Sequence, residues 1–359
     1  MAKTITIKIG SNVLTSKTGV LDEVRISNLV NQIAQLHHNG NKIILVSSGA
    51  VASGRSLVRL SRKLDMVSER QLLSSVGQVK LVNIYSQLFE KHHLNIAQVL
   101  VTKEDFRTRE HYLNMKNCIS SLLDNNIIPV VNENDAVSVT ALMFTDNDEL
   151  SGLLASMIGC DELIILTNVD GIYDGDPLAE NSRVIRKIEN RSGDLSDYIL
   201  TSKSDFGRGG MLTKCRIAQK TSSSGISVRI ANGTKEDVLL RLMEKSDEFI
   251  HTHFVPGTKK GAVKKWIAYS EGFANAEIVI NKGAENALNS DKATSLLLPG
   301  VVEIRGEFKK GDLLRIRNEK NVVIGIGKAH YDIEKAKKQK GDKKSKPLIH
   351  YDYLYLYTK

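Results

Sequence analysis

The sequence predicts an α/β protein with a largely parallel sheet covered by helices, followed by a smaller β-rich domain. Three observations lead to this fold class. Short apolar, β-branched segments recur along the first part of the chain, amphipathic helical patterns separate several of them, and the pattern changes after about Lys245. Strands that alternate with helices are typical of parallel sheets with helices on their faces. We therefore expect a first domain at residues 1–250, a linker at 251–273 and a β-rich domain at 274–359.

The strands of the first domain are expected in the order TITIKIG, NKIILVSSG, NIAQVLVT, NIIPVVNEND, DELIILTNVDG and GISVRIANG. Each is short, rich in β-branched residues and followed by small or polar residues. The clearest helical pattern follows the first strand and ends at Gly40, with apolar residues at Ile26, Leu29, Val30, Ile33 and Leu36. Ligands in open α/β sheets bind beyond the carboxyl ends of the strands, so these ends should converge on one crevice.

The segment after residue 250, THFVPGTKKGAVKKWIAYS, is interpreted as a basic connector, because Pro256, Gly257 and Gly261 interrupt regular structure. Beyond it, AEIVINKGAENAL, GVVEIRGEFKKGDLLRIRN and VVIGIGKAHYD are typical of short strands joined by tight turns. The segment 335–346 carries seven lysines and one aspartate, and we expect it to be a solvated loop.

The net charge, the cysteines and the apolar segments limit the classes of partner and the cellular location that we expect for this protein. The net charge of +9 over 359 residues is consistent with an anionic partner, either nucleic acid or a phosphorylated metabolite. The three cysteines, Cys118, Cys160 and Cys215, are widely spaced and suggest neither disulfides nor a zinc site, so a reducing, cytoplasmic location is expected. The opening MAKTITIKIG lacks a signal-peptide layout, and no apolar run is long enough to span a bilayer. We expect neither secretion nor membrane insertion.

Two lysines are candidates for binding phosphate. The stretch FGRGGMLTKCR places Lys214 after three glycines, where a helix begins. Glycines let backbone N–H groups approach a ligand, and a helix N-terminus favours anions, although a plain surface turn is the alternative. Lys8 lies among β-branched residues in KIGSNVL and needs an anionic partner or solvent, the alternative being an exposed edge strand. The Walker pattern is absent, which argues against a P-loop enzyme.

Other strand ends carry candidate ligand-binding residues. In VSSGAVASG, small polar residues including Ser48 could hold a carboxylate or phosphate, or form a simple turn into a helix. Asp135, Asn147 and Asp148, in NENDAVSV and FTDNDELSGLLAS, could bind a substrate ammonium, orient a catalytic lysine or bind Mg²⁺, but their spacing specifies no metal site. Asp146 is better interpreted as a helix cap.

The segment LTNVDGIYDGDP places Thr167 and Asn168 at another strand end. Its aspartate, glycine and proline residues are typical of turns. Nucleotide contacts from the threonine and the asparagine are compatible with such a turn.

Taken in order, KIGSNVLT, VSSGAVASG, NENDAV, TDNDELSG, LTNVDGIYDGDP and GRGGMLTK resemble the motif series of the amino-acid kinase family. INKGAENAL, SLLLPGVVEIRGEFKKGDLLRI and GIGKAHYD are similar to a PUA domain, and the whole resemblance covers nearly the entire chain. It implies transfer of the γ-phosphoryl group of ATP to the side-chain carboxylate of L-glutamate, the first step of proline synthesis. It also implies Mg²⁺ and a homo-oligomer.

By motif position, the resemblance gives each site residue a role. Lys8 and Lys214 would contact the phosphates, Asp148 would organise both lysines, and glutamate would be held by Ser48, Asp135 and Asn147. ATP would be bound by Lys8, Thr167, Asn168 and the loop residues Arg208, Gly209, Gly210, Met211, Leu212, Thr213 and Lys214. The segment TKEDFRTREHYLN resembles the one associated with inhibition by proline, which makes Asp105 a candidate regulatory residue.

The sequence departs from the family pattern at two places. Arg208 stands where the family loop commonly has a small hydroxyl residue, and GIGKAHYD stands where a more basic, glycine-rich turn is common. The alternatives are a kinase for another acceptor, such as aspartate, acetylglutamate, a nucleoside monophosphate or an isoprenoid phosphate, and an RNA-binding or RNA-modifying protein. The RNA alternative predicts strongly salt-dependent affinity but leaves the N-terminal motif series unexplained.

Overall fold

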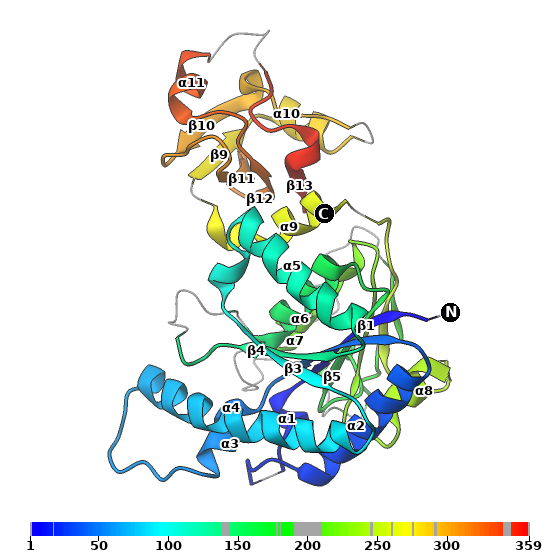
Figure 1. Ribbon diagram of the computed structural model, residues 1–359. Coiled ribbons are helices and arrows are strands. Elements are labelled where there is room, and N and C mark those ends of the chain that lie inside the picture. Colours follow the sequence, from blue (N-terminus) through cyan, green and yellow to red (C-terminus); the bar gives the residue numbers. More distant parts are fainter. Residues whose placement is uncertain are drawn as a thin grey trace. The chain divides into compact units, whose positions relative to one another are not determined.

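The computed structural model describes residues 2–357 except 17, 138–143, 145, 177–178, 180, 190–209, 245–246, 260, 275, 291–292 and 340–345. The chain divides into two compact units, Met1–Lys259 and Lys260–Lys359 (Figure 1). Within the described residues, no helix combines the length and the apolar character needed to cross a membrane.

An eight-stranded sheet forms the centre of the first unit, in the order β3-β4-β2-β1-β5-β7-β8-β6. Its strands are β1 (Thr4–Ile9), β2 (Lys42–Ser47), β3 (Ile96–Val101), β4 (Ile128–Glu133), β5 (Glu162–Thr167), β6 (Lys187–Ile188), β7 (Ser227–Asn232) and β8 (Thr252–Phe254). Neighbouring strands run parallel, except that β8 is antiparallel to β7. The prediction of a largely parallel sheet is confirmed.

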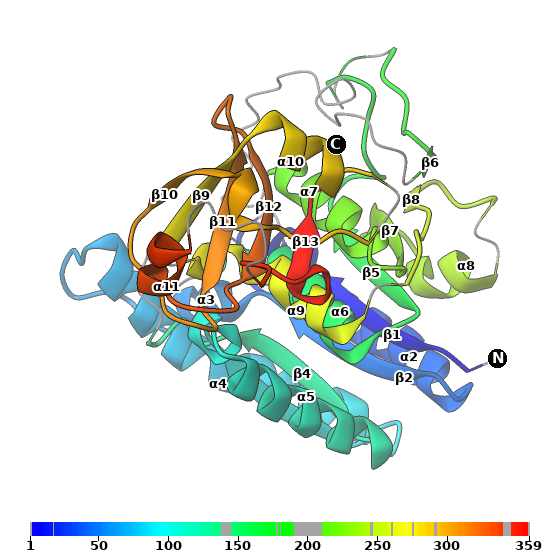
Figure 2. The same ribbon diagram turned by 90° about the horizontal axis from the view of Figure 1, so that it is seen from above.

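Helices cover both faces of this sheet (Figure 1). One face carries α1 (Ser11–Leu14), α2 (Glu23–His38), α3 (Ala50–Arg55), α4 (Met66–Glu90) and α8 (Val238–Glu244). The other carries α5 (Arg109–Asp124), α6 (Asn147–Ile158) and α7 (Met211–Ser222). Seen from above in Figure 2, α5 lies over β4 and α6 over β1. Because both faces are covered, the central strands are apolar and buried along most of their length.

Helix α2 forms where its apolar spacing predicts. Asp22 caps its N-terminus by accepting a hydrogen bond from the Arg25 backbone N–H at 3.0 Å. The five apolar residues that define the helical pattern are all buried: Ile26, Leu29, Val30, Ile33 and Leu36.

The order of the strands positions the candidate site. β4, β2, β1 and β5 are consecutive parallel neighbours, so their carboxyl ends lie along one edge of the sheet. These ends are Glu133, Ser47, Ile9 and Thr167. Polar residues far apart in the sequence are thereby brought to one edge.

Helices α3 and α4 pack so closely that their backbones touch at two glycines. A Cβ atom built on Gly54 would lie 2.0 Å from the Leu73 carbonyl oxygen, and one built on Gly77 would lie 1.8 Å from the Ala50 carbonyl oxygen. Neither position accepts a larger residue without a backbone shift. Since α3 directly follows Ser48 and Gly49, this packing also holds the loop after β2.

We expect Gly77→Ala to lower the free energy of unfolding by about 1–3 kcal/mol, because the methyl group would push α3 and α4 apart. Urea unfolding measures the effect. Gly261→Ala is the control, since nothing lies within 4 Å of a Cβ atom at Gly261. Equal stability of the two variants would contradict the packing argument.

The second unit is built on a five-stranded sheet in the order β10-β9-β11-β12-β13. Its strands are β9 (Ala276–Ile280), β10 (Val301–Arg305), β11 (Leu313–Asn318), β12 (Val323–Lys328) and β13 (Leu354–Leu356). Helices α9 (Ala262–Tyr269), α10 (Lys282–Leu288) and α11 (Ile333–Lys338) accompany the sheet, with 3-10 turns at Glu271–Phe273, Leu298–Gly300 and Tyr351–Tyr353. The predicted β-rich C-terminal part is confirmed.

The structure differs from the predicted linker at 251–273. Residues Thr252–Phe254 form β8 within the sheet of the first unit, and residues Ala262–Tyr269 form α9 in the second unit. The lysines and glycines around both segments weaken the local strand and helix patterns in the sequence. Pairing with β7 stabilises β8, and burial of Trp266 and Ile267 stabilises α9. The lysine-rich segment 335–346 also begins within α11 rather than in a loop.

Candidate active site

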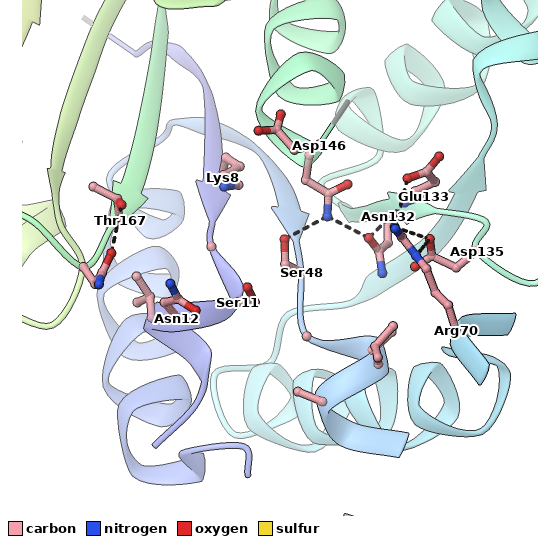
Figure 3. Close-up of a pocket in the computed structure, with 18 of the residues that line it drawn as sticks. Lys8, Ser11, Asn12, Ser48, Arg70, Asn132, Glu133, Asp135, Asp146 and Thr167 are labelled. Atoms are coloured by element: carbon pink, nitrogen blue, oxygen red, sulfur yellow. Dashed lines mark hydrogen bonds and ion pairs between the residues drawn. The ribbon is translucent and has the colours of Figure 1, made fainter. Parts of the chain in front are cut away.

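The carboxyl ends of β1, β2, β4 and β5 open into a cavity of about 490 Å³ (Figure 3). Its walls come from seven separate segments of the first unit. The polar residues of the lining are Lys8, Ser11, Asn12, Ser48, Arg70, Asn132, Glu133, Asp135, Asp146, Asn147, Thr167, Asn168 and Lys214. The strand-end segments therefore converge on one crevice, as the sheet topology requires.

Two lysines meet on one buried carboxylate in this cavity. Lys8 Nζ lies 2.6 Å from Asp148 Oδ1, and Lys214 Nζ lies 2.7 Å from Asp148 Oδ2. Asp148 is fully buried, whereas the two lysine side chains are 6% and 12% exposed. One aspartate thus holds two ammonium groups side by side.

Opposing effects act on the Asp148 carboxyl. Burial alone would raise its pKa, but the charges of Lys8 and Lys214 and their hydrogen bonds lower the pKa to about 2. Asp148 is therefore ionised at neutral pH.

Asp146 begins α6 as its N-cap. Its Oδ1 accepts hydrogen bonds from the backbone N–H groups of Asp148 and Glu149 at 2.9 and 3.1 Å, which agrees with the interpretation as a helix cap. Its Oδ2 is buried without a hydrogen-bond partner. Burial, followed by repulsion from Asp148, raises the pKa of Asp146 to about 6.

This raised pKa predicts a pH-dependent stability. The unfolded chain ionises Asp146 at its ordinary pKa of 3.8, so the group destabilises the fold progressively as the pH rises from about 4 to 6. Asp146→Asn keeps the cap without the charge. In EDTA and without nucleotide, urea unfolding should show the variant gaining stability relative to wild type across this window, with a constant difference above about pH 7. A difference that does not change with pH would contradict the prediction.

A chain of amides and hydroxyls lines the centre of the cavity. Asn147 Nδ2 donates to Ser48 Oγ and to Asn132 Oδ1, each at 2.9 Å, and Asn132 Nδ2 donates to Gln78 Oε1 at 3.0 Å. Figure 3 shows Ser48 and Asn132 facing this shared amide group. Ser48 and Asn147, both predicted as substrate-binding, are thus in direct contact.

Arg70 and two acids form the far end of the cavity. Arg70 Nη2 lies 2.6 Å from Asp135 Oδ1, Arg70 Nε donates to the same oxygen at 2.9 Å, and Glu133 Oε2 lies 3.5 Å from Nη2. Asp135 was predicted as a substrate-binding residue, but Arg70, Asn132 and Glu133 were given no role from the sequence. Arg70 lies in a helical segment without a strand-end or glycine-rich motif, so no local signal in the sequence distinguishes it.

The predicted nucleotide residues are only partly within the cavity lining. Thr167 and Asn168 line the cavity at the end of β5, and Lys214 reaches it from α7. Figure 3 shows Thr167 on the side of the cavity opposite Arg70. Gly210 is the N-cap of α7, and Met211, Leu212 and Thr213 form its first turn, outside the lining. Arg208 and Gly209 lie outside the described residues. The ATP-loop assignment stays a prediction.

Asp105 lies outside the cavity lining. Its Oδ2 accepts hydrogen bonds from the Thr102 backbone N–H at 2.7 Å and from Thr102 Oγ1 at 2.9 Å. The backbone bond belongs to the capping box of η1 (Lys103–Phe106), in which the Thr102 side chain in turn accepts from the Asp105 backbone N–H. The structure therefore gives Asp105 a local role in holding this turn, and its regulatory role stays a prediction.

The residues fit a metal ion that arrives with a nucleotide. Among the described residues, no group of three His, Cys, Asp or Glu side chains could hold a metal. Mg²⁺ usually keeps several waters and binds one or two carboxylates together with substrate phosphates. Asp146 Oδ2 is a buried carboxylate oxygen without a hydrogen-bond partner at this position, whereas Asp148 Oδ1 is ion-paired with Lys8.

Comparison with known proteins identifies the family. The model of the amino acid kinase family matches residues 3–232, more than half of the chain. The chain belongs to the amino acid kinase family. A PUA domain model matches residues 276–351, so the β-rich second unit contains a PUA domain. The resemblance inferred from the ordered motifs is confirmed.

The curated relatives are more specific than the family model. The chain is 53% identical to glutamate 5-kinase from Bacteroides thetaiotaomicron, over 98% of each chain. It is 48% identical to glutamate 5-kinase from Chlorobaculum tepidum, over 98% of this chain and 97% of the relative. The amino acid kinase is therefore an enzyme of the phosphotransferase class and groups with the glutamate 5-kinases.

A solved structure supports the fold alone. Carbamate kinase from Giardia lamblia, bound to AMP-PNP, is 17% identical and superposes with a TM-score of 0.51, covering 71% of this chain and 99% of its own. The fold class predicted from the sequence is confirmed by this similarity and by the observed sheet.

Proposed function

We propose that this kinase transfers the γ-phosphoryl group of ATP to the side-chain carboxylate of L-glutamate, forming L-glutamyl 5-phosphate and ADP as the first step of proline synthesis. The observation that carries the proposal is the meeting of Lys8 and Lys214 on Asp148 in a cavity with two different polar ends. Thr167 and Asn168 line one end, Ser48 and Asn132 line the centre, and Asp135 and Arg70 line the other end. The identity to glutamate 5-kinases supports the choice of acceptor.

The acceptor requires no general base. A glutamate side chain has an ordinary pKa near 4.3, so its carboxylate is already ionised at neutral pH and can attack directly. A carboxylate oxygen forms the new bond to phosphorus, and the bond between phosphorus and the β,γ-bridging oxygen breaks. Both electrons of that bond leave with ADP.

The main barrier is electrostatic, because two anions must approach each other. Lys8 and Lys214 would stabilise the charge on the transferring phosphoryl group, and Asp148 fixes both ammonium groups before the substrates bind. When bound, Mg²⁺ would neutralise charge on the nucleotide phosphates, and Asp146, whose Oδ2 has no hydrogen-bond partner, would help to hold it. Ser48 and Asn147 would position the acceptor carboxylate between these charges.

The decisive experiment measures ATP-dependent acyl phosphate, trapped as the hydroxamate, with L-glutamate, L-aspartate and N-acetyl-L-glutamate in parallel. Selective turnover of L-glutamate would support the proposal. Selective turnover of either other acceptor would replace the proposed substrate, and no turnover by folded protein would reject the proposed reaction.

We also propose that proline inhibits this reaction and that Asp105 contributes through the turn that it holds. Phe106, next to Asp105, packs against Phe144 with ring centroids 5.8 Å apart. The Phe144 backbone N–H donates to Glu133 Oε1 at 2.9 Å. The turn is therefore connected to the acidic end of the cavity.

Replacing Asp105 with alanine should remove the capping box, which shifts this turn while leaving the cavity lining intact. We expect kcat to stay close to that of the wild type and half-inhibition to need several-fold more proline. Glu104→Ala is the control, since Glu104 forms a surface ion pair with Arg107, whose side chain is 53% exposed. Unchanged inhibition in the Asp105 variant would remove this residue from regulation.

A further inference from the structure

Resting on the proposed function, we propose that Arg70 determines acceptor specificity by binding the α-carboxylate of the substrate amino acid. Arg70 lies in the second turn of α4, whose N-terminus is capped by Asp65 through two backbone hydrogen bonds of 3.0 Å. Its side chain is 31% exposed and lines the cavity.

One side of the Arg70 guanidinium, that of Nη1, is accessible to a ligand. Both of its short contacts, from Nε and Nη2, fall on the single oxygen Asp135 Oδ1. The next acid, Glu133, lies 3.5 Å from Nη2. Within the part of the chain that the structure describes, Arg70 donates its one geometrically formed hydrogen bond from Nε, and Nη1 donates none. An arginine presents five N–H donors in a planar fork, so the Nη1 side can receive a carboxylate while Nε still holds Asp135.

The acidic residues at this end of the cavity mean that a substrate α-carboxylate needs a cation there. The ammonium and α-carboxylate of an amino acid share one carbon, so both must enter the same region. Glu133 and Asp135 are 3% and 8% exposed, and they would attract the ammonium but repel the neighbouring carboxylate. Of the three cationic side chains that line the cavity in the described residues, Lys8 and Lys214 are held by Asp148.

Arg70 is therefore the cation placed at the acidic end. Figure 3 shows it beside Asp135 and Glu133, with Ser48 lying between it and Lys8. An acceptor that spans this distance would place its α-carboxylate at Arg70 and its reacting carboxylate near the lysines. Acceptors without a free α-carboxylate should bind poorly.

The test compares wild type, Arg70→Gln and Arg70→Lys on L-glutamate, its α-amide and 4-aminobutyrate, which lacks the α-carboxylate. We expect Arg70→Gln to lower kcat/KM for L-glutamate about 100-fold, mainly through KM, because a charge-assisted bidentate contact is lost. The low kcat/KM for the α-amide and for 4-aminobutyrate should change less than threefold. Arg70→Lys should retain part of the preference, and the KM for ATP should stay unchanged in both variants.

Arg55→Gln is the matched control, because Arg55, the last residue of α3, is 65% exposed, pairs with Glu69 of α4 and does not line the cavity. Calorimetric titration of L-glutamate and of its α-amide into wild type and Arg70→Gln gives a readout independent of turnover. If Arg70→Gln weakens both ligands by the same factor, Arg70 merely positions Asp135 and the proposal is overturned. Unchanged glutamate binding would overturn it equally. If wild type neither binds nor phosphorylates L-glutamate, the proposed function fails first.

Discussion

Asp148→Asn is expected to lower the free energy of unfolding by about 3–5 kcal/mol, because it leaves two nearly buried ammonium groups without their shared counter-charge. Removing one partner of a buried ion pair costs far more than the pair contributes. The low pKa of Asp148, about 2, means that the carboxylate's contribution is fully present above about pH 4 and is lost only as the pH falls through about 2. Urea unfolding at pH 7 measures the difference.

The surface pair Lys42–Asp124 provides the control. Its side chains are 46% and 66% exposed, although the N–O distance is 2.7 Å, close to that of the buried pairs. Exposed pairs contribute about 0–1 kcal/mol, so Asp124→Asn should change stability little. Comparable losses in the two variants would mean that burial of Asp148 does not determine its importance.

Lys8→Met is expected to lower kcat about 100- to 1000-fold at saturating ATP and L-glutamate, the range found when one preorganised charge-stabilising donor is removed. Methionine fills a similar volume in β1, and Asp148 retains Lys214 at 2.7 Å, so the fold should persist. Steady-state kinetics with hydroxamate trapping measures the loss, and circular dichroism checks the fold.

Lys42→Met is the matched control, since Lys42 begins the neighbouring strand β2, is 46% exposed and lies outside the cavity lining. Its kcat should equal that of wild type. A Lys8→Met enzyme with undiminished kcat would exclude Lys8 from the reaction and leave Lys214 as the candidate to test next.

Local patterns were sufficient for much of the molecule. The apolar spacing of α2 predicted its buried face, and the recurrent β-branched segments predicted the parallel sheet. The same patterns failed at β8 and α9, which lie in a stretch rich in lysine, glycine and proline. These elements depend on pairing with β7 and on burial of Trp266, which involve residues distant in the sequence.

The candidate site likewise has features that the sequence predicts and features that depend on tertiary contacts. The sequence by itself predicted Lys8, Lys214 and the polar strand ends as candidate site residues, because a lysine amid apolar residues and a glycine-rich helix start are costly without a partner or ligand. Only the tertiary structure decided that both lysines share Asp148, and that Arg70 faces an acid 65 residues away. The physical reason is that propensity and turn chemistry act between near neighbours, whereas side-chain contacts across the cavity depend on how the helices pack on the sheet.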